Sequence, residues 1–468
     1  MLDYELIIIG GGVGGTAIGA ILASKGFKTL LIEKNKFIGG RCSSYEKDGF
    51  KIDIGVHTFG RTSKGPHGKI LNMIGMEDAI DWVLCRNPGP RWFYQGKFWK
   101  FPKEFNELIP NLDFSNFMKL LRDVMRMKNL DEIERRSARS LLSQYSDNNL
   151  LHSFINIISM LYFVVPYFET SVSEFVRCLS SLAEDFSIGY PKGGCISIPL
   201  TYAQGIENFG GKIQKSQSVK KIIVENEKVQ GIELDNGKII SSKVVISNAG
   251  IRETVNNMIG RKFFEGNYLK KVDNLKYTMS ALTLKVALKK PITNFKLITS
   301  FSLHDPEEYF NSILEGDVPD DVFLFVPIPS NFDPSLAPKG KQLIIAGTSV
   351  PKENFNRNKE KWIENSMKSL ENIFPDLSDN LMWYDVSTPK DIGDLGGKES
   401  SVIGIAQIMN QTGKDRPSPK LPIEGLYLVG GDAGGWGIGT ELAAKSAIEC
   451  SEMILAKYSF KLKKKLKK

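Results

Sequence analysis

Glycines near the N-terminus have the spacing of a site that binds a dinucleotide. Gly10, Gly12 and Gly15 follow an uninterrupted apolar run at 6–9, which is typical of a parallel strand covered on both faces. The first glycine permits a tight turn, the second lets the backbone approach a pyrophosphate, and the third lets the next helix pack against the strand. The N-terminal amides of that helix would then hold the phosphate charge.

The elements needed to position these glycines follow in order along the chain. Apolar residues recur at helical spacing over 13–25, and Gly26 stands at the usual C-cap position. A second strand over 29–32 leads to Glu33, an acid roughly 20 residues beyond the glycines, which suits a hydrogen bond to a ribose 2′-hydroxyl. The combination predicts a dinucleotide site, but the motif alone does not separate FAD from NAD.

The size and composition of the chain indicate an ordinary globular protein of two or three domains. It has 468 residues, of which 42% are hydrophobic and 24% charged, and this length is too great for one compact core. Its five cysteines form no CxxC pair, so we expect neither a metal site nor a disulfide framework. We expect a reducing, cytoplasmic setting. The cysteines are Cys42, Cys85, Cys178, Cys195 and Cys450.

Positive charge is concentrated at the C-terminus. The net charge is +8, and the segment 457–468 carries seven lysines and no acid. Such a tail is either a solvated, disordered end or a contact with anionic lipid at the inner face of a membrane. We expect no nucleic-acid partner.

Residues 82–186 differ in character from the N-terminal part. Aromatic residues crowd 92–101, and apolar residues at intervals of three and four over 114–125 predict one apolar helix face. These side chains form either a protein core or the wall of a tunnel for an apolar substrate.

The segment 149–168 carries no formal charge and must be considered as a membrane span. Pro166 interrupts its end, and polar residues follow one another at helical spacing, which favours a buried or interfacial helix. The polar residues are His152, Ser153, Asn156 and Ser159.

Strand-like runs alternate with turns over the second half of the chain, which predicts a meander followed by a mixed sheet. The runs lie at 219–224, 229–234, 238–241, 277–288, 322–326 and 342–348. A last apolar strand at 425–429 leads to Gly431 and Asp432, and a helix beginning near Gly439 would present a second N-terminus to an anion.

Several of these motifs resemble those of a known family. Glu33, the run Gly39-Gly40-Arg41 and the pattern Asp53-x-Gly55-x-His57 are similar to the FAD-binding N-terminus of the flavin amine oxidase superfamily, especially its phytoene desaturase-like branch of carotenoid and retinoid oxidoreductases. The resemblance extends from Glu5 to Leu455. It implies an α/β fold, in which a Rossmann-type FAD-binding domain carries an inserted α+β substrate domain.

The resemblance also divides the chain. It assigns 1–85, 187–275 and 400–456 to the FAD-binding domain, 86–186 and 276–399 to the substrate-binding domain, and 457–468 to a basic tail.

Family membership would also imply which residues hold FAD. Val219 would lend its backbone to the adenine, Asp432 would bind near the ribityl and pyrophosphate, and the helix near Gly439 would point its positive end at the pyrimidine side of the flavin. The expected set is Gly10, Gly12, Val13, Gly14, Gly15, Glu33, Lys34, Gly39, Gly40, Arg41, Gly55, Val219, Gly431, Asp432, Gly439 and Thr440.

Two side chains are candidates for moving a proton beside the flavin. Glu441 falls at the expected flavin edge, and His57 belongs to the Asp53-x-Gly55-x-His57 loop. Glu441 is alternatively a helix N-terminal cap, and His57 alternatively makes a structural hydrogen bond. Thr440-Glu441 is also a departure, because carotene desaturases of this type have another glycine-rich turn there. Substrate and reaction direction therefore stay open.

The resemblance implies an FAD-dependent oxidoreductase that desaturates, saturates or isomerises a long apolar isoprenoid or polyene by hydride transfer with the flavin. One alternative is an amine or protoporphyrinogen-type flavin oxidase, although the terminal motif lacks the cysteine through which some amine oxidases hold flavin covalently. Another is a prenyl-binding escort protein similar to the GDP dissociation inhibitors, which bind no flavin. The intact phosphate-turn glycines disfavour this last alternative.

Overall fold

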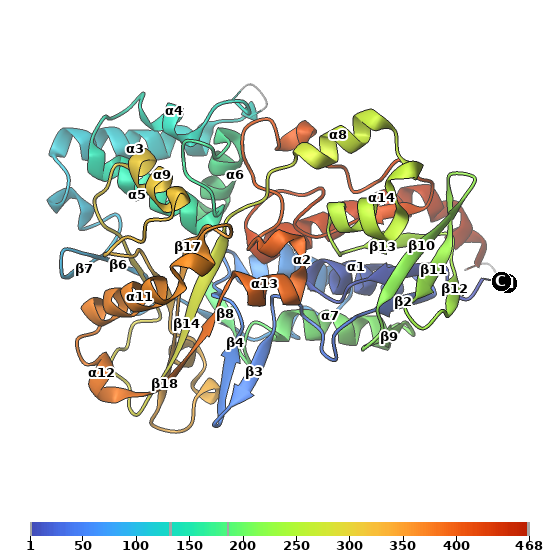
Figure 1. Ribbon diagram of the computed structural model, residues 1–468, viewed down its shortest axis with the longest axis horizontal. Coiled ribbons are helices and arrows are strands. Elements are labelled where there is room, and N and C mark those ends of the chain that lie inside the picture. The colour runs from blue at the N-terminus through green and yellow to red at the C-terminus, as the bar shows by residue number, and fades with distance from the viewer. Residues whose placement is uncertain (1, 131–132, 185–186, 466–468) are drawn as a thin grey trace.

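The computed structural model describes residues 2–130, 133–184 and 187–465. Its elements gather around two large sheets, one in each half of the elongated molecule (Figure 1). The expected domain boundary after residue 186 falls on residues 185–186, and the tail ends with residues 466–468. Both of these segments lie outside the described residues.

The first half is built on a five-stranded parallel sheet. Its strands come from segments far apart in the sequence, because parallel neighbours need long crossover connections. In spatial order they are β19 (Leu426–Leu428), β13 (Val245–Ser247), β1 (Leu6–Ile9), β2 (Thr29–Ile32) and β9 (Lys212–Gln214).

Apolar residues on alternate sides of β1 explain why both faces of this sheet are covered. Leu6 and Ile8 pack with helices on one face, whereas Ile7 and Ile9 pack with a three-stranded sheet on the other. The helices are α1 (Val13–Ser24), α7 (Ser197–Asn208) and α14 (Gly439–Lys465), and the smaller sheet is formed by β10 (Val219–Glu225), β11 (Lys228–Leu234) and β12 (Ile239–Ser241).

The second half is built on a seven-stranded sheet in which all neighbours are antiparallel except β15 and β6. Strands from the ranges 91–99 and 280–387 therefore share one sheet. In order they are β18 (Leu381–Ser387), β14 (Ser280–Leu288), β17 (Gln342–Val350), β16 (Phe325–Pro327), β15 (Leu297–Ser300), β6 (Arg91–Tyr94) and β7 (Lys97–Trp99).

Helices cluster beside this sheet and bury an aromatic-rich core. In Figure 1 they lie at the end of the molecule opposite β10–β12. They are α3 (Asn111–Arg126), α4 (Ala138–Leu142), α5 (Asn149–Tyr162), α6 (Val172–Ala183), α9 (Pro306–Glu315), α11 (Lys359–Ile373) and α12 (Leu377–Asn380).

Shorter elements connect the two halves. The hairpin of β3 (Ser44–Lys47) and β4 (Phe50–Asp53) belongs to the range 1–85, yet Phe50 and Ile52 pack against the seven-stranded sheet. The remaining elements are β5 (Trp82–Leu84), β8 (Gly189–Pro191), α2 (Pro66–Met73), α8 (Gly266–Asn274), α10 (Pro329–Phe332) and α13 (Pro389–Gly396).

The uncharged segment after residue 149 forms the buried helix α5 and then turns back on itself. The polar line of α5 is bonded within the protein: the Asn156 side chain accepts from the Tyr167 N–H at 3.1 Å, and Ser153 donates to the His304 carbonyl at 2.7 Å. Across residues 2–130, 133–184 and 187–465, no helix is both long enough and apolar enough to cross a membrane.

The last helix is longer than the sequence predicts. A helix ending near Ala456 was expected, but α14 runs to Lys465, so the backbone of the basic tail is helical as far as the structure describes it. Two strands begin later than the sequence predicts. The strand predicted at 322–326 begins only at Phe325, as β16, and the strand predicted at 277–288 begins only at Ser280, as β14.

Candidate functional site

A cavity of about 1150 Å³ extends between the two halves of the molecule. A pocket for one drug-sized ligand measures about 300–1,000 Å³, so this cavity is larger than such a pocket. Its lining joins the glycine turn after β1 to the aromatic helices around α3 and α5.

The glycine turn has the geometry of an anion site. Gly10 has a positive φ of 97°, and a Cβ on Gly15 would lie 2.0 Å from the Gly10 carbonyl oxygen, so α1 can only pack this closely with glycine there. Gly12 is the N-cap of α1, no side chain caps it, and the first turn of α1 holds no acid. These amides therefore remain available to a phosphate at the positive end of the helix dipole.

Glu33 is positioned at the end of β2 by two backbone donors. Its carboxylate accepts hydrogen bonds from the N–H of Gly11 at 2.6 Å and of Asn35 at 2.8 Å. The side chain is almost fully buried and lines the cavity. A carboxylate held in this way can accept a ribose hydroxyl beside the phosphate turn.

Arg41 uses its guanidinium to anchor a loop that borders the cavity. Nη1 donates to the carbonyl oxygens of Ser401 at 2.6 Å and Val402 at 2.7 Å, and Nη2 donates to that of Ile403 at 3.3 Å. Burial lowers the pKa of Arg41. The residue thus joins the Gly39-Gly40 turn to the returning chain.

Most of the residues expected to bind the cofactor line this one cavity. The exceptions are Gly15, which packs under the turn, and Asp432. Those that line it are Gly10, Gly12, Val13, Gly14, Glu33, Lys34, Gly39, Gly40, Arg41, Gly55, Val219, Gly431, Gly439 and Thr440.

Asp432 differs from the expectation because its side chain does not line the cavity. The fully buried carboxylate accepts hydrogen bonds from the N–H of Ile251 at 3.0 Å, the hydroxyl of Tyr277 at 3.2 Å and the N–H of Ile405 at 3.3 Å. It therefore holds three chain segments together behind the site.

Glu441, in the first turn of α14, does reach the cavity. Its Oε1 atom accepts from the N–H of Gly60 at 2.9 Å and of Arg61 at 3.3 Å. Burial raises the pKa of this carboxyl, although the two N–H donors oppose the shift. Glu441 thus combines a structural contact with the protonation behaviour that general acid–base chemistry needs.

His57 also lines the cavity, and its Nδ1 lies 3.9 Å from Asp53 Oδ2, too far for a hydrogen bond. Among the described residues Nδ1 has no hydrogen-bond partner. Burial lowers the pKa of His57, which favours the neutral ring. A neutral imidazole can accept or donate one proton, but the unpartnered Nδ1 is itself buried and is not exposed to a ligand in the cavity.

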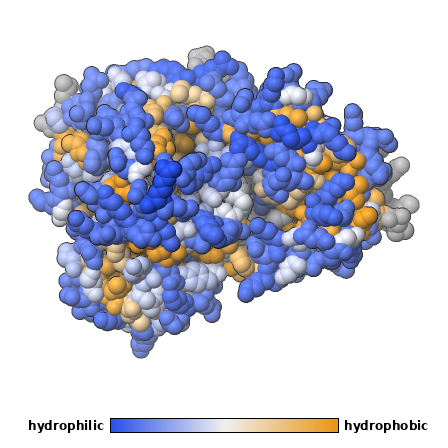
Figure 2. Space-filling model, in the orientation of Figure 1, coloured by the Kyte–Doolittle hydropathy of each residue, from blue (hydrophilic) through white to orange (hydrophobic). Residues whose placement is uncertain are grey.

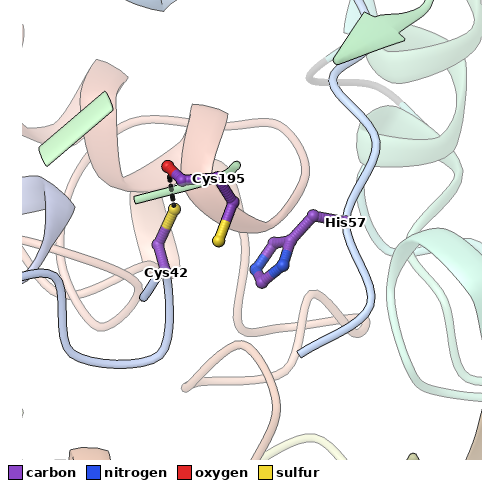
Figure 3. A group of neighbouring side chains, drawn as sticks. All are labelled: Cys42, His57 and Cys195. Carbon is purple, nitrogen blue, oxygen red and sulfur yellow. Dashed lines mark hydrogen bonds between the residues drawn. The ribbon is translucent and has the colours of Figure 1, made fainter. Parts of the chain in front are cut away.

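The sequence predicts no metal site, yet the fold brings two cysteines and His57 together (Figure 3). The sulfur atoms of Cys42 and Cys195 and a ring nitrogen of His57 lie within 4.8 Å of one another. Cys42 donates to the Cys195 carbonyl at 3.3 Å, and Cys195 donates to the Ser43 carbonyl at 3.6 Å. Burial raises the pKa of Cys195 well above its usual range. These two hydrogen bonds join residues 42–43 to the segment before α7.

Asn248 and Tyr162 are among the lining residues that the sequence does not predict. Asn248 follows β13, and its side chain donates to the Gly10 carbonyl at 3.4 Å. Tyr162 is the last residue of α5, and burial raises its pKa to about 12, which keeps the hydroxyl protonated. Neither lies in a motif, because each reaches the cavity only through the packing of its element.

The aromatic residues of the substrate half divide between core and cavity wall. Phe105 and Phe117 are fully buried and do not line the cavity. Trp92, Phe101 and Phe154 do line it, and the Trp92 and Phe154 ring centroids are 4.6 Å apart. On the face shown in Figure 2, hydrophobic side chains are exposed in a hollow beside α6.

Comparisons with known proteins agree with this geometry. The sequence matches the family of flavin containing amine oxidoreductases over residues 14–455. It is 26% identical to prolycopene isomerase 2 of an Oncidium hybrid cultivar, over 98% of this chain and 85% of that protein. It is 25% identical to a zeta-carotene-forming phytoene desaturase of Myxococcus xanthus, over 91% of this chain and 89% of that protein.

Similar solved structures support the fold. An oxidoreductase from Methanosarcina mazei matches with a TM-score of 0.78 and 22% identity, over 96% of this chain and 99% of that one. A cyclohexylamine oxidase from Brevibacterium oxydans matches with a TM-score of 0.68 and 13% identity, over 98% of this chain and 100% of that one. A Rab GDI from Plasmodium falciparum matches with a TM-score of 0.58 and 16% identity, over 97% of this chain and 98% of that one. The chain belongs to the family of flavin containing amine oxidoreductases, in its phytoene desaturase-like branch, and is a flavin-dependent oxidoreductase.

Proposed function

We propose that the protein binds FAD and exchanges a hydride with a long apolar isoprenoid or polyene, which it desaturates, saturates or isomerises. The observation that carries this proposal is the cavity, in which a phosphate-binding turn at one end is continuous with an aromatic and aliphatic wall at the other. The named activities of the two curated relatives, a prolycopene isomerase and a phytoene desaturase, support a polyene substrate.

The residues present fit FAD. The uncapped amides at the start of α1 would hold the pyrophosphate, Glu33 would hold a ribose, and the backbone at Val219 would meet the adenine. A bound flavin supplies a hydride acceptor or donor. The positive φ of Gly10 and the 2.0 Å approach of a Gly15 Cβ to the Gly10 carbonyl oxygen both require glycine in this turn, which supports the assignment.

The protein itself would exclude water and align the substrate. Leu121, Val124, Phe154 and Ile158 line the cavity from α3 and α5, and none of them carries a polar group. Such a wall favours an apolar chain through burial of its surface. Flavin redox chemistry on a C–H bond needs this dry alignment more than it needs reactive side chains.

Glu441 is our choice for the group that holds or moves a proton. Its carboxyl lines the cavity with a raised pKa, and Oε1 is fixed by the N–H groups of Gly60 and Arg61. His57 is the second choice, because it lines the cavity and burial favours its neutral form.

The test is the anaerobic visible spectrum of the purified protein before and after mixing with liposomes loaded with an acyclic carotene. We expect flavin bands that bleach on mixing, with no change on addition of empty liposomes. Bleaching by soluble amines but by no polyene would contradict the proposal. A protein without flavin bands would instead support an escort protein that binds no flavin.

We also infer that the protein works in the cytoplasm, at the inner face of a membrane held by its basic tail. The helix α14 continues through Lys465 into a segment rich in lysine, and each lysine near an anionic surface contributes about 1 kcal/mol. We expect the full chain to sediment with phosphatidylserine vesicles at low salt and a chain ending at Tyr458 not to do so.

A further inference from the structure

The cavity reaches solvent in two different places. Most of its lining residues are buried or half-buried, but eight are exposed. Four lie around the phosphate turn and the expected adenine end, and four lie in the substrate half. The first group is Lys34, Asp235, Glu253 and Gly397, and the second is Lys100, Pro102, Arg122 and Met125.

The second opening is formed by one face of α3 and the chain just after β7. Met118, Leu121, Arg122 and Met125 all line the cavity, and their spacing places them on one side of the helix. Phe101 packs on this helix with its ring centroid 6.1 Å from that of Phe117. Lys100 directly precedes Phe101, and it lines the same cavity as Arg122. We refer to Lys100, Pro102, Arg122 and Met125 as the distal rim.

The two openings differ in charge. The opening near the phosphate turn has both signs, since Lys34 stands with Asp235 and Glu253. The four residues of the distal rim include two cations and no acid, and the Glu104 carboxylate lies beside them, where it accepts from the Lys100 N–H at 2.8 Å. Within the described part of the chain, neither Lys100 nor Arg122 has a side-chain ion pair. The apolar wall therefore ends at a positively charged opening.

A third cation lies deeper on the same side. Arg91 lines the cavity, and its Nη1 donates to the carbonyl oxygens of Gly89 at 3.0 Å and Pro90 at 3.2 Å. The acids that line the cavity are Glu33, Asp235 and Glu253 at the nucleotide end and Glu441 at the start of α14. This separation of charge raises the local concentration of anions at the distal rim.

We propose that the substrate is an amphiphile with an anionic end, a phosphate or a carboxylate, which Lys100 and Arg122 bind while its apolar chain lies along the cavity. The inference rests on the proposed function and deepens it by naming the substrate class. Arg122 offers a planar set of donors that matches either anion, and Lys100 offers a point charge. The same cations repel an ammonium group, which disfavours amine substrates.

The test compares two probes of equal chain length, a C20 polyprenyl monophosphate and the corresponding neutral C20 polyprenol, on the purified flavin-loaded protein. Quenching of tryptophan fluorescence reports binding, because Trp92 lines the cavity. We expect the phosphate to bind at least about tenfold more tightly than the alcohol, as for a charge-assisted contact. Arg122→Leu and Lys100→Met should each reduce this preference without weakening the alcohol.

Matched controls come from the same segments. Arg126→Leu on α3 and Lys103→Met beside Pro102 remove exposed cations that do not line the cavity, so they should leave the preference unchanged. Sedimentation with phosphatidylserine vesicles separates lipid headgroups from the end of the substrate. If the Arg122 and Lys100 variants lose vesicle binding but keep the preference for the phosphate, the rim is a lipid contact and the inference is overturned.

Other outcomes also decide the matter. Equal binding of the phosphate and the alcohol by the wild-type protein would overturn the anionic end and leave the proposed function standing. Binding of neither probe would overturn the anionic end, whereas the proposed function would still be decided by the bleaching of the flavin with the carotene. If Arg122→Leu abolishes binding of both the phosphate and the alcohol, the residue shapes the cavity and does not select for the negative charge. This result would also overturn the inference.

Discussion

The Glu441 carboxylate accepts a hydrogen bond from the Gly60 N–H at 2.9 Å, across 381 positions of sequence. The contact joins the first turn of α14 to the loop that follows His57. Both ends of this contact line the cavity. This hydrogen bond links Glu441 to the loop after His57, the other catalytic candidate, and no local motif could specify it.

The variant Glu441→Gln separates a proton-transfer role from a structural one. Glutamine keeps an oxygen that can accept from the N–H groups of Gly60 and Arg61, but it cannot titrate. We expect flavin reduction by the polyene to slow by about 100-fold or more, the usual effect of losing a general acid or base.

The pH profile supplies the second readout. Burial raises the pKa of Glu441 above 4.5, so the carboxyl stays protonated to higher pH than an exposed glutamate. The wild-type rate should therefore change at a pH above 4.5, and this change should be absent from Glu441→Gln. If Glu441→Gln reduced its flavin at the wild-type rate and with the wild-type pH profile, Glu441 would have only a structural role.

Alanine at position 15 should prevent flavin binding. The added Cβ would lie 2.0 Å from the Gly10 carbonyl oxygen, so backbone must move, and we expect a loss of at least about 2 kcal/mol in unfolding free energy. The ratio of flavin to protein absorbance and a urea titration measure both effects. Gly266→Ala is the control, because its Cβ would meet nothing within 4 Å. A Gly15→Ala protein with a full complement of flavin would contradict the assigned turn.

Asp432→Asn tests whether this carboxylate supports the fold. Three donors converge on it from Ile251, Tyr277 and Ile405, and an amide can accept through only one of its two positions. We expect the flavin-free protein to lose about 2–3 kcal/mol of unfolding free energy, because a buried donor is left without its acceptor. Tyr277→Phe should lower the free energy of unfolding by about 1 kcal/mol, because it removes one of these hydrogen bonds. An Asp432→Asn protein that is fully stable but binds flavin weakly would instead assign the side chain to the cofactor.

Lys285 makes stability depend on pH in the alkaline range. It is buried in β14, and desolvation lowers its pKa from 10.5 to about 8 in the folded protein. Between about pH 8 and pH 10.5 the unfolded chain binds more protons, so the folded state gains stability as pH rises.

The comparison with Lys285→Met isolates this effect. Relative to that variant, the wild type should gain about 2–3 kcal/mol between pH 8 and pH 10.5. Below pH 8 the methionine variant should be the more stable, since it buries no charge. Urea unfolding of both proteins at several pH values measures the difference. If the unfolding free energies of the two proteins changed with pH in the same way, Lys285 would not be desolvated in the folded state.

Local signals in the sequence predicted the nucleotide-binding half well. The helix expected over 13–25 is α1, Val13–Ser24, and Gly26 has the positive φ of 83° that a C-cap glycine adopts. The strands of the meander also lie within one or two residues of their expected positions. These features depend on neighbours in the chain, which a periodic pattern and a glycine report directly.

The substrate half was less predictable from the sequence. Two aromatic residues of this half differ in their surroundings, since Phe117 is buried in the core and Phe101 lines the cavity. Only the packing of the elements against one another decides which side chains meet the cavity. The tail helix also continued beyond its expected end. The periodicity of apolar residues predicts which face of a helix is buried, but it does not predict which element or cavity that face meets.

By itself the sequence determined the glycine turn, Glu33, the second helix start at Gly439 and hence the nucleotide-binding fold, because backbone geometry and short-range spacing dictate each of them. Only the tertiary structure decided that Asp432 does not line the cavity and that Asn248, Tyr162, Lys100 and Arg122 do. These residues come from separate elements, and their contacts depend on long-range packing, which no spacing along the chain encodes.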